Sequence, residues 1–171
     1  MTEVILAFGS NVGDKVDQIQ TAIDRLVDSG LRCDAISSCY KSKPVGMKDQ
    51  PDFVNAVGRF FCSKCSPFDV LRLILRIETE MGRVRTVENG PRSIDIDLIF
   101  FGRQQIATNS LTVPHGEYGS RRFVLEPMCE LIPSFQPPGR GGSSVSELLE
   151  ICPDITSNPV KISEFCKISD E

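Results

Sequence analysis

Residues 90–102, GPRSIDIDLIFFG, read as a buried β-strand that carries two carboxylates. Asp95 and Asp97 alternate with isoleucine and leucine in a run that ends in two phenylalanines. Because successive side chains of a strand point to opposite faces, the two aspartates share one face, about 6.6 to 7 Å apart along the backbone. Burying a carboxylate without a partner is too costly for this arrangement to persist. The stretch therefore predicts that the shared face either opens to water or meets a cation.

Basic residues stand on both sides of this strand in the sequence. Arg83, Arg85 and Arg92 precede the aspartates, and His115, Arg121 and Arg122 follow them. Two neighbouring carboxylates repel each other unless a cation lies between them, and Mg²⁺ takes oxygen ligands of this kind. The planar guanidinium group suits phosphate oxygens. The combination indicates phosphoryl transfer, although each arginine taken singly is equally compatible with surface charge and a lone histidine is more often structural.

The hydrophobic pattern of the remaining chain predicts an α+β fold. Up to residue 102 it gives strands at 4–8, 32–43, 52–62 and 90–102, with one helix between Asp14 and Gly30 and another between Ser66 and Gly82. After residue 102 we expect a hairpin arm, a helix broken near Pro127, a short helix at 144–152 and an edge strand near 159–168. The order β-α-β-β-α-β favours a ferredoxin-like sheet with helices packed on it.

Length and composition limit the classes of protein to consider. The 171 residues fit one domain, 1–171, and 40% apolar with 25% charged residues is the composition of an ordinary globular protein. A net charge of -4 argues against a nucleic-acid reader that depends on a basic face. The N-terminal stretch resembles neither a signal peptide nor a membrane span, so we expect a cytoplasmic protein.

Three further features carry weaker signals. The seven cysteines are odd in number and scattered, which predicts reduced thiols, with a redox pair at Cys62 and Cys65 as the alternative. The turn at residues 9–11 follows a strand, and its amides are candidates for binding an anion. Phe53 and Asn55 share a strand face, where they either hold a flat heterocycle or belong to the core.

Five blocks of the sequence together resemble the 6-hydroxymethyl-7,8-dihydropterin pyrophosphokinase family of folate biosynthesis. They are FGSNVGD, PVGMKDQPDFVNAV, GRVR, GPRSIDIDLIFFG and LTVPHGEYGSRRFVLEPMCELIP, in the order and spacing of that family. They cover most of residues 4–135, and residues 136–171 read as a C-terminal extension of the same domain. The resemblance implies a ferredoxin-like α/β/α sandwich, with a mainly antiparallel sheet and helices on both faces.

The resemblance also implies an activity and a set of site residues. The family moves the pyrophosphoryl group of ATP to the hydroxymethyl oxygen of the pterin and releases AMP. On its pattern, Asp95 and Asp97 match the ligands of two Mg²⁺ ions, and the catalytic group comprises Asp95, Asp97, Arg83 and Arg92. The ATP side would comprise Glu78, Arg85, Arg92, Leu98, Thr112, His115 and Arg121, and the pterin side Ser42, Val45, Gly46, Phe53, Asn55 and Phe123.

The partners expected from this reading are the two small-molecule substrates, with no nucleic acid, no membrane and a monomeric chain. Two alternatives remain open at this point. One is a pterin or nucleotide binder without turnover, and the other is a thiol oxidoreductase centred on Cys62 and Cys65.

Overall fold

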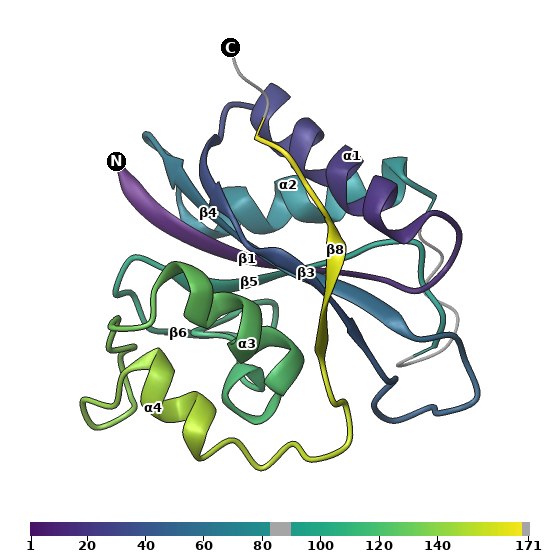
Figure 1. Cartoon of the computed structure of the whole chain (residues 1–171). Coiled ribbons are helices and arrows are strands. Elements are labelled where there is room, and N and C mark those ends of the chain that lie inside the picture. The colour runs from purple at the N-terminus through teal and green to yellow at the C-terminus, as the bar shows by residue number, and fades with distance from the viewer. Residues whose placement is uncertain (83–89, 169–171) are drawn as a thin grey trace.

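An open sheet with helices on both faces forms the frame of the protein, seen in a computed structural model that describes residues 1–82 and 90–168 (Figure 1). In chain order the elements are β1 (Thr2–Ser10), α1 (Lys15–Asp28), β2 (Arg32–Ile36), β3 (Ser38–Ser42), β4 (Phe53–Cys62), α2 (Pro67–Glu80), β5 (Asp95–Phe101), β6 (Ile106–Ala107), β7 (Thr112–Val113), a 3₁₀ turn (Tyr118–Ser120), α3 (Arg122–Leu131), α4 (Val145–Glu150) and β8 (Val160–Phe165).

The strands of the main sheet follow the order β5-β1-β4-β3-β8, and β2 pairs with the other half of β4. All of these pairs are antiparallel. β2 and β3 behave as one strand interrupted at Ser37, whose hydroxyl accepts the Val57 N–H at 2.9 Å. Taken so, the first four strands have the ferredoxin-like order, which confirms the predicted α+β class with a mainly antiparallel sheet.

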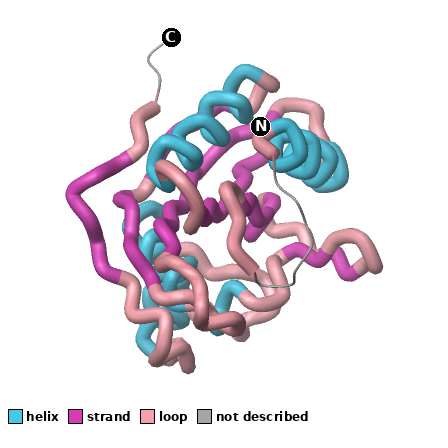
Figure 2. The backbone as a smooth tube through the Cα atoms, turned by 90° about the vertical axis from the view of Figure 1, so that its right-hand side faces the viewer, coloured by secondary structure: helices cyan, strands magenta, loops and turns pink. Residues whose placement is uncertain are grey.

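Side-chain alternation along the central strands gives the sheet two cores. Val4, Leu6 and Phe8 of β1 pack with α1 and α2, whereas Ile5 and Ala7 pack with α3 and α4. Figure 2 shows the strands running between these two helical layers. Because both faces are covered, the strands read as continuous apolar runs instead of alternating ones. Polar side chains of the central strands are therefore expected near the strand ends, at the edge of the helical layers.

The helix starts are set by local capping, as the sequence predicts. Asp14 caps α1 by accepting the Asp17 N–H at 3.1 Å, and Ser66 caps α2 in a reciprocal capping box with Asp69. The predicted break near Pro127 is wrong, since α3 continues through it. Pro127 is buried, and packing of α3 against the sheet offsets the N–H that proline lacks.

The cysteine pair that the sequence raised as the alternative to reduced thiols is brought together by the fold. Cys62, at the end of β4, and Cys65, just before α2, have Cα atoms 6.1 Å apart, a separation that a disulfide spans. Their sequence separation of three lets the turn between strand and helix bring them together. The cysteines recorded as free are Cys33, Cys39, Cys129, Cys152 and Cys166.

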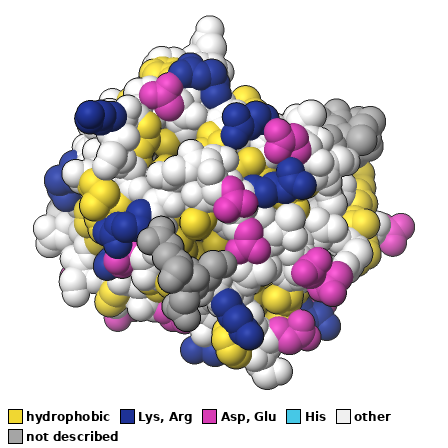
Figure 3. Space-filling view, turned by 90° about the horizontal axis from the view of Figure 1, so that it is seen from above, with side chains coloured by type: hydrophobic (Ala, Val, Ile, Leu, Met, Phe, Trp, Pro, Cys, Tyr) yellow, Lys and Arg dark blue, Asp and Glu magenta, His cyan; other side chains and the backbone are white. Residues whose placement is uncertain are grey.

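The upper face of the molecule, drawn in Figure 3, carries charges of both signs side by side. Lys and Arg side chains lie among Asp and Glu side chains on this face, without a continuous basic area. Within residues 1–82 and 90–168, no helix is long and apolar enough to cross a membrane.

Candidate active site

The aspartates of β5 lie where this strand leaves the core on the α3 side of the sheet. Asp95 stands opposite Gly9 of β1 and Asp97 opposite Ala7. Farther along the same row of side chains, Ile99 is buried under α3, while Ile96 faces α1 and α2. Asp95 and Asp97 therefore lie on the same face of the sheet, as the alternation predicts. They occupy the open end of this row of side chains, and Ile99 farther along the row belongs to the buried core.

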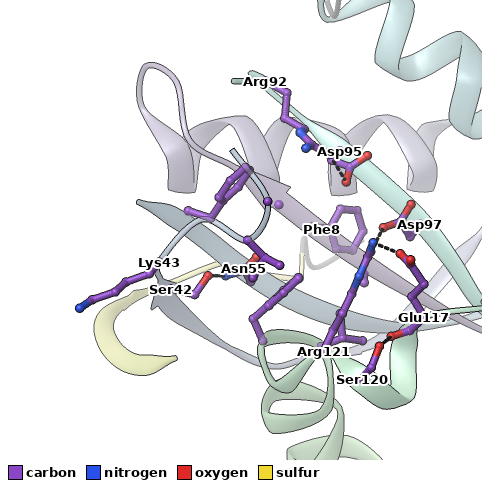
Figure 4. A pocket seen from close by; sticks show the side chains of 17 residues that line it. Phe8, Ser42, Lys43, Asn55, Arg92, Asp95, Asp97, Glu117, Ser120 and Arg121 are labelled. Atoms are coloured by element: carbon purple, nitrogen blue, oxygen red, sulfur yellow. Dashed lines mark hydrogen bonds and ion pairs between the residues drawn. The ribbon is translucent and has the colours of Figure 1, made fainter. Parts of the chain in front are cut away.

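Each aspartate is accompanied by an arginine from a different element. Arg92 Nη1 lies 3.1 Å from Asp95 Oδ2, and Arg121 Nη1 lies 3.8 Å from Asp97 Oδ2 (Figure 4). Arg121 also forms an ion pair with Glu117. In each of the two Asp–Arg pairs, both side chains have less than a third of their surface exposed. The shared face thus meets cationic groups, as one of the two sequence-based alternatives requires.

The same two arginines lie over aromatic rings. The Arg92 guanidinium is 5.4 Å from the centre of the Phe53 ring, and that of Arg121 is 5.8 Å from the centre of the Phe123 ring. Contacts of this kind hold a guanidinium in place while its N–H groups can still donate hydrogen bonds in the plane of the guanidinium group. Phe53 and Phe123 come from β4 and α3 and line the same cavity, so both Arg–Phe pairs contribute to its walls.

That cavity has a volume of about 240 Å³ and contains all of the residues predicted to contact the pterin. It is lined by Ala7, Phe8, Gly9, Ser42, Lys43, Val45, Gly46, Phe53, Asn55, Arg92, Asp95, Asp97, Glu117, Ser120, Arg121, Phe123 and Val124. Asn55 is 5% exposed, and its amide donates to Ser42 Oγ at 2.7 Å and to the Tyr40 carbonyl at 3.4 Å. The orientation of this amide is therefore fixed by the protein itself.

Gly9 shapes the floor of this cavity. A Cβ at this position would lie 3.5 Å from Asn55 Oδ1 and 3.8 Å from the Phe53 ring, so glycine leaves both groups open to the cavity.

A second cavity adjoins the first and contains Glu78, Leu98, Thr112 and His115 of the predicted ATP side, whereas Arg92 and Arg121 of that side line the first cavity. The lining of the second cavity comprises Leu71, Ile74, Leu75, Glu78, Asp95, Ile96, Asp97, Leu98, Ser110, Leu111, Thr112, His115, Gly116 and Glu117. Asp95, Asp97 and Glu117 belong to both linings. Molecules bound in the two cavities would consequently meet at the aspartates.

Two titratable groups of the second cavity are held by backbone hydrogen bonds. Glu78 is 2% exposed and its Oε2 accepts the Ile96 N–H at 3.1 Å. His115 Nδ1 accepts the Glu117 N–H at 3.1 Å, which leaves the proton of the neutral ring on Nε2. Burial, with the nearby Arg121 guanidinium, lowers the pKa of His115 from its ordinary value, so the ring is neutral at pH 7.

Some sequence-based candidates are not part of this arrangement. Arg83 and Arg85 lie outside the described residues. Arg122 turns away from both cavities to the carbonyl of Asp154, which accepts its Nε–H at 3.2 Å. The backbone N–H of Asn11 is not available to an anion, because it donates to the Arg92 carbonyl at 3.1 Å.

Sequence reasoning gave Asn11 a different role and missed Glu117. Asn11 Oδ1 accepts the Arg92 N–H at 2.9 Å, and its side-chain amide donates to Gln50 and to the Pro51 carbonyl, so it connects two site loops. Glu117 stands two residues after His115 and four before Arg121, and that spacing was the available signal.

Asp95 and Asp97 supply carboxylate oxygens of the kind that Mg²⁺ binds, but they form only part of a coordination shell. Within residues 1–82 and 90–168, no group of three or more His, Cys, Asp or Glu side chains is arranged to hold a metal ion. Two neighbouring carboxylates with access to phosphate and water are what a magnesium site needs when the substrate supplies the other ligands. A site complete from protein ligands alone, as for structural zinc, is not found in the described part of the chain.

Comparison with known proteins agrees with this geometry. The family model described as 7,8-dihydro-6-hydroxymethylpterin-pyrophosphokinase (HPPK) matches residues 5–133. A Pseudomonas aeruginosa protein named 2-amino-4-hydroxy-6-hydroxymethyldihydropteridine pyrophosphokinase is 40% identical over 153 residues, which cover 88% of this chain and 91% of the relative.

Longer relatives carry a similar segment. The Schizosaccharomyces pombe folic acid synthesis protein fol1 is 41% identical over 134 residues, but these are 78% of this chain and only 18% of that protein. In a crystal structure of Plasmodium falciparum HPPK-DHPS, the matching part has a TM-score of 0.68 at 15% identity and covers 87% of this chain and 43% of the other. At that identity the likeness shows the fold.

Proposed function

The chain belongs to the 7,8-dihydro-6-hydroxymethylpterin-pyrophosphokinase family, and from this premise we propose how its two cavities divide the reaction. The protein transfers the pyrophosphoryl group of ATP to the hydroxymethyl group of 6-hydroxymethyl-7,8-dihydropterin in folate biosynthesis, giving the pterin diphosphate and AMP. The pterin occupies the cavity between Phe53 and Phe123, and the nucleotide occupies the cavity of Glu78 and His115. The observation that carries this proposal is that Asp95 and Asp97 line both.

On the pterin side, the ring lies between the two phenylalanine rings, with Asn55 facing its polar edge. Ser42 holds the amide of Asn55, and Val45 and Gly46 close the cavity. The N–H groups of the Asn55 amide donate to Ser42 and to the Tyr40 carbonyl, so its Oδ1 is the atom that accepts a hydrogen bond from an N–H group of the pterin. This arrangement directs the hydroxymethyl group toward the aspartates.

On the nucleotide side, adenine contacts the apolar lining that includes Leu98, with Thr112 and Glu78 as its polar neighbours. His115 donates from Nε2 to a phosphate oxygen, since its Nδ1 is already bonded. Arg92 and Arg121 bind phosphate oxygens from the two walls, and Arg83 and Arg85 are assigned to the same task from the sequence pattern.

The chemical step is a displacement at the β-phosphorus. The hydroxymethyl oxygen forms a bond to that phosphorus, the bond to the oxygen bridging the α- and β-phosphates breaks, and AMP leaves with that oxygen. Asp97 is the nearest acceptor for the hydroxyl proton. Arg92 and Arg121 stabilise the charge that grows on the phosphate oxygens, and because they are already stacked and paired, little reorganisation is required.

Asp95 and Asp97 would hold two Mg²⁺ ions. Bound there, the ions supply positive charge to the triphosphate and lower the pKa of the attacking hydroxyl.

The test is incubation of the purified chain with Mg-ATP and 6-hydroxymethyl-7,8-dihydropterin, followed by separation of AMP from ADP. We expect AMP in equal amount to the pterin diphosphate, with loss of both products in Asp95→Ala and Asp97→Ala. Asp28→Asn, at the exposed end of α1, is the matched control and keeps activity. ADP as the nucleotide product, or activity in both alanine variants, would refute the proposal.

The remaining expectations are proposals of the same kind. We propose that the chain is one domain, acts as a monomer in the cytoplasm and does not need a nucleic acid. Light scattering of the purified chain tests the monomeric state, and fractionation of the cells that make it tests the cytoplasmic location. The pea relative is named a mitochondrial folate synthesis bifunctional protein, so fractionation should include organelles.

A further inference from the structure

The turn at residues 154–157, between α4 and β8, bonds to both walls of the pterin-side cavity. Its own geometry is well defined: Asp154 Oδ1 accepts the N–H groups of Thr156 and Ser157, each at 3.0 Å. Ser157 is fully buried, and its hydroxyl donates to the other oxygen of Asp154. The turn is therefore organised around one carboxylate.

Toward α3, the turn replaces a missing helix cap. The residue at the N-cap position, Arg121, offers no side-chain cap, but Asp154 Oδ2 accepts the N–H of Arg122 at 3.0 Å. A carboxylate here also interacts favourably with the helix dipole. Arg121 and Phe123 stand on either side of the capped residue, so the cap holds the α3 wall of the cavity.

Toward β3, the turn binds the segment that closes the cavity. The Ser157 carbonyl accepts the N–H of Lys43 at 2.8 Å. Lys43 directly follows Ser42, which bonds Asn55, and precedes Val45 and Gly46 of the lining. One four-residue turn thus connects the backbone of both walls.

The charged state of Asp154 is consistent with this role. Burial alone would raise its pKa, but hydrogen bonds from Ser157, Thr156 and Arg122 lower it overall. The carboxylate stays ionised at neutral pH and accepts all of these bonds.

We propose that Asp154 is a positioning residue for the pterin, which sets the distance between the α3 wall and the Ser42–Gly46 segment. The inference rests on the proposed function of this cavity. Asp154 lies beyond residues 5–133 that the family model matches. Asp154 is not among the residues that line the second cavity, and the part of the nucleotide machinery next to the capped residue is Arg121, so its influence should be larger on the pterin than on ATP.

The test is Asp154→Asn in the full chain. Asparagine keeps the volume and one acceptor for the turn, but it directs an amide N–H at the N–H of Arg122. We expect the KM for the pterin to rise about three- to tenfold, as loss of one cap and its coupling would give, with a smaller change in the KM for ATP through Arg121. Hydrogen exchange should become faster at the amides of both Arg122 and Lys43.

Two variants serve as comparison. Glu150→Gln removes an acid from the exposed end of α4 and should change neither KM nor exchange. Ser157→Ala keeps the carbonyl that binds Lys43 and loses only one bond to Asp154, so it should give a smaller change in the same direction, and it tests the proposal if Asp154→Asn folds poorly.

An unchanged pterin KM, or an equal rise in both KM values, would overturn the inference. Faster exchange at Arg122 alone would overturn it too, because Asp154 would then cap a helix without connecting the walls. Absence of AMP with the unaltered chain would instead refute the proposed function, while the exchange at the two amides would still decide whether the turn connects them.

Discussion

The two cavities that meet at β5 are built on different principles. The pterin-side cavity is bounded by polar groups that are already bonded to one another, such as Asn55 with Ser42, and by rings that carry stacked arginines. The neighbouring cavity has an apolar part formed by side chains of α2 and β5, and its polar groups include the buried Glu78 and the neutral His115, each held by a backbone N–H.

This difference shows where selectivity arises. A heterocycle is distinguished by preset donors and acceptors, whose mismatch leaves buried groups unpaired and is costly. An apolar wall discriminates less between flat bases, so we expect tight selection for the pterin and more tolerance for the base of the nucleotide. The two aspartates shared by the cavities should contribute to the chemical step, and not to the selection of the pterin or of the nucleotide base.

The largest effect should come from the shared group. Asp97→Asn keeps the shape of the side chain and removes its charge and its ability to take a proton, so we expect kcat to fall about 10³-fold. Calorimetry with the pterin should still show binding, because Asn55 and the two rings are intact. A fall in pterin affinity that matches the fall in kcat would mean that Asp97 serves binding instead of chemistry.

The second effect should be confined to the pterin side. Asn55→Leu removes a buried amide whose partners then remain unpaired, and we expect the KM for the pterin to rise about 30-fold while the KM for ATP stays constant. Ser42→Ala leaves the amide in place but removes its acceptor at 2.7 Å, so its effect on the same constant should be smaller. Steady-state kinetics with each substrate varied in turn measures both, and an equal change for ATP would contradict the division between the cavities.

The division of the site into two cavities was only partly accessible from the sequence. Alternation along a strand is a local rule, so residues 94–98 sufficed to place Asp95 and Asp97 on one face. Caps at Asp14 and Ser66 are local as well, and both were found. The resemblance to a family then supplied the roles of residues that lie far apart in the chain.

What the sequence did not reveal depends on contacts between distant segments. Asn11 bonds to Arg92 and Gln50, and Asp154 caps a helix that begins 32 residues earlier, so no local pattern announces either role. Pro127 misled because its local tendency to end a helix is overcome by burial against the sheet. Cys62 and Cys65 were close enough in sequence to be noticed, but only the conformation of the turn decides whether they pair.

A third, smaller effect should be confined to the nucleotide side. Glu78→Gln keeps an acceptor for the Ile96 N–H but replaces the buried carboxyl group by an amide. We expect the KM for ATP to rise about three- to tenfold, with the KM for the pterin unchanged. Glu80→Gln is the matched control, since that residue is two positions away, half exposed and paired with Arg25 outside the cavities. A change in pterin KM of the same size would show that the two cavities are coupled through β5.

The smallest effect concerns the protonation of His115. Because burial and Arg121 lower its pKa in the folded chain, the unfolded chain binds more protons than the folded one between the folded-state value and about 6.5. The free energy of unfolding should therefore decrease as the pH falls through this window, and His115→Gln should lack this component. His115 is the single histidine of the chain, so its ring signals in NMR spectra give the midpoint directly. A midpoint at or above 6.5 would contradict the lowered pKa of His115.

Protonation of Nδ1 would also break its bond from the Glu117 N–H and add a positive charge beside the phosphates. A change in ATP binding over the same pH range, with pterin binding constant, would show that His115 acts on the nucleotide side alone.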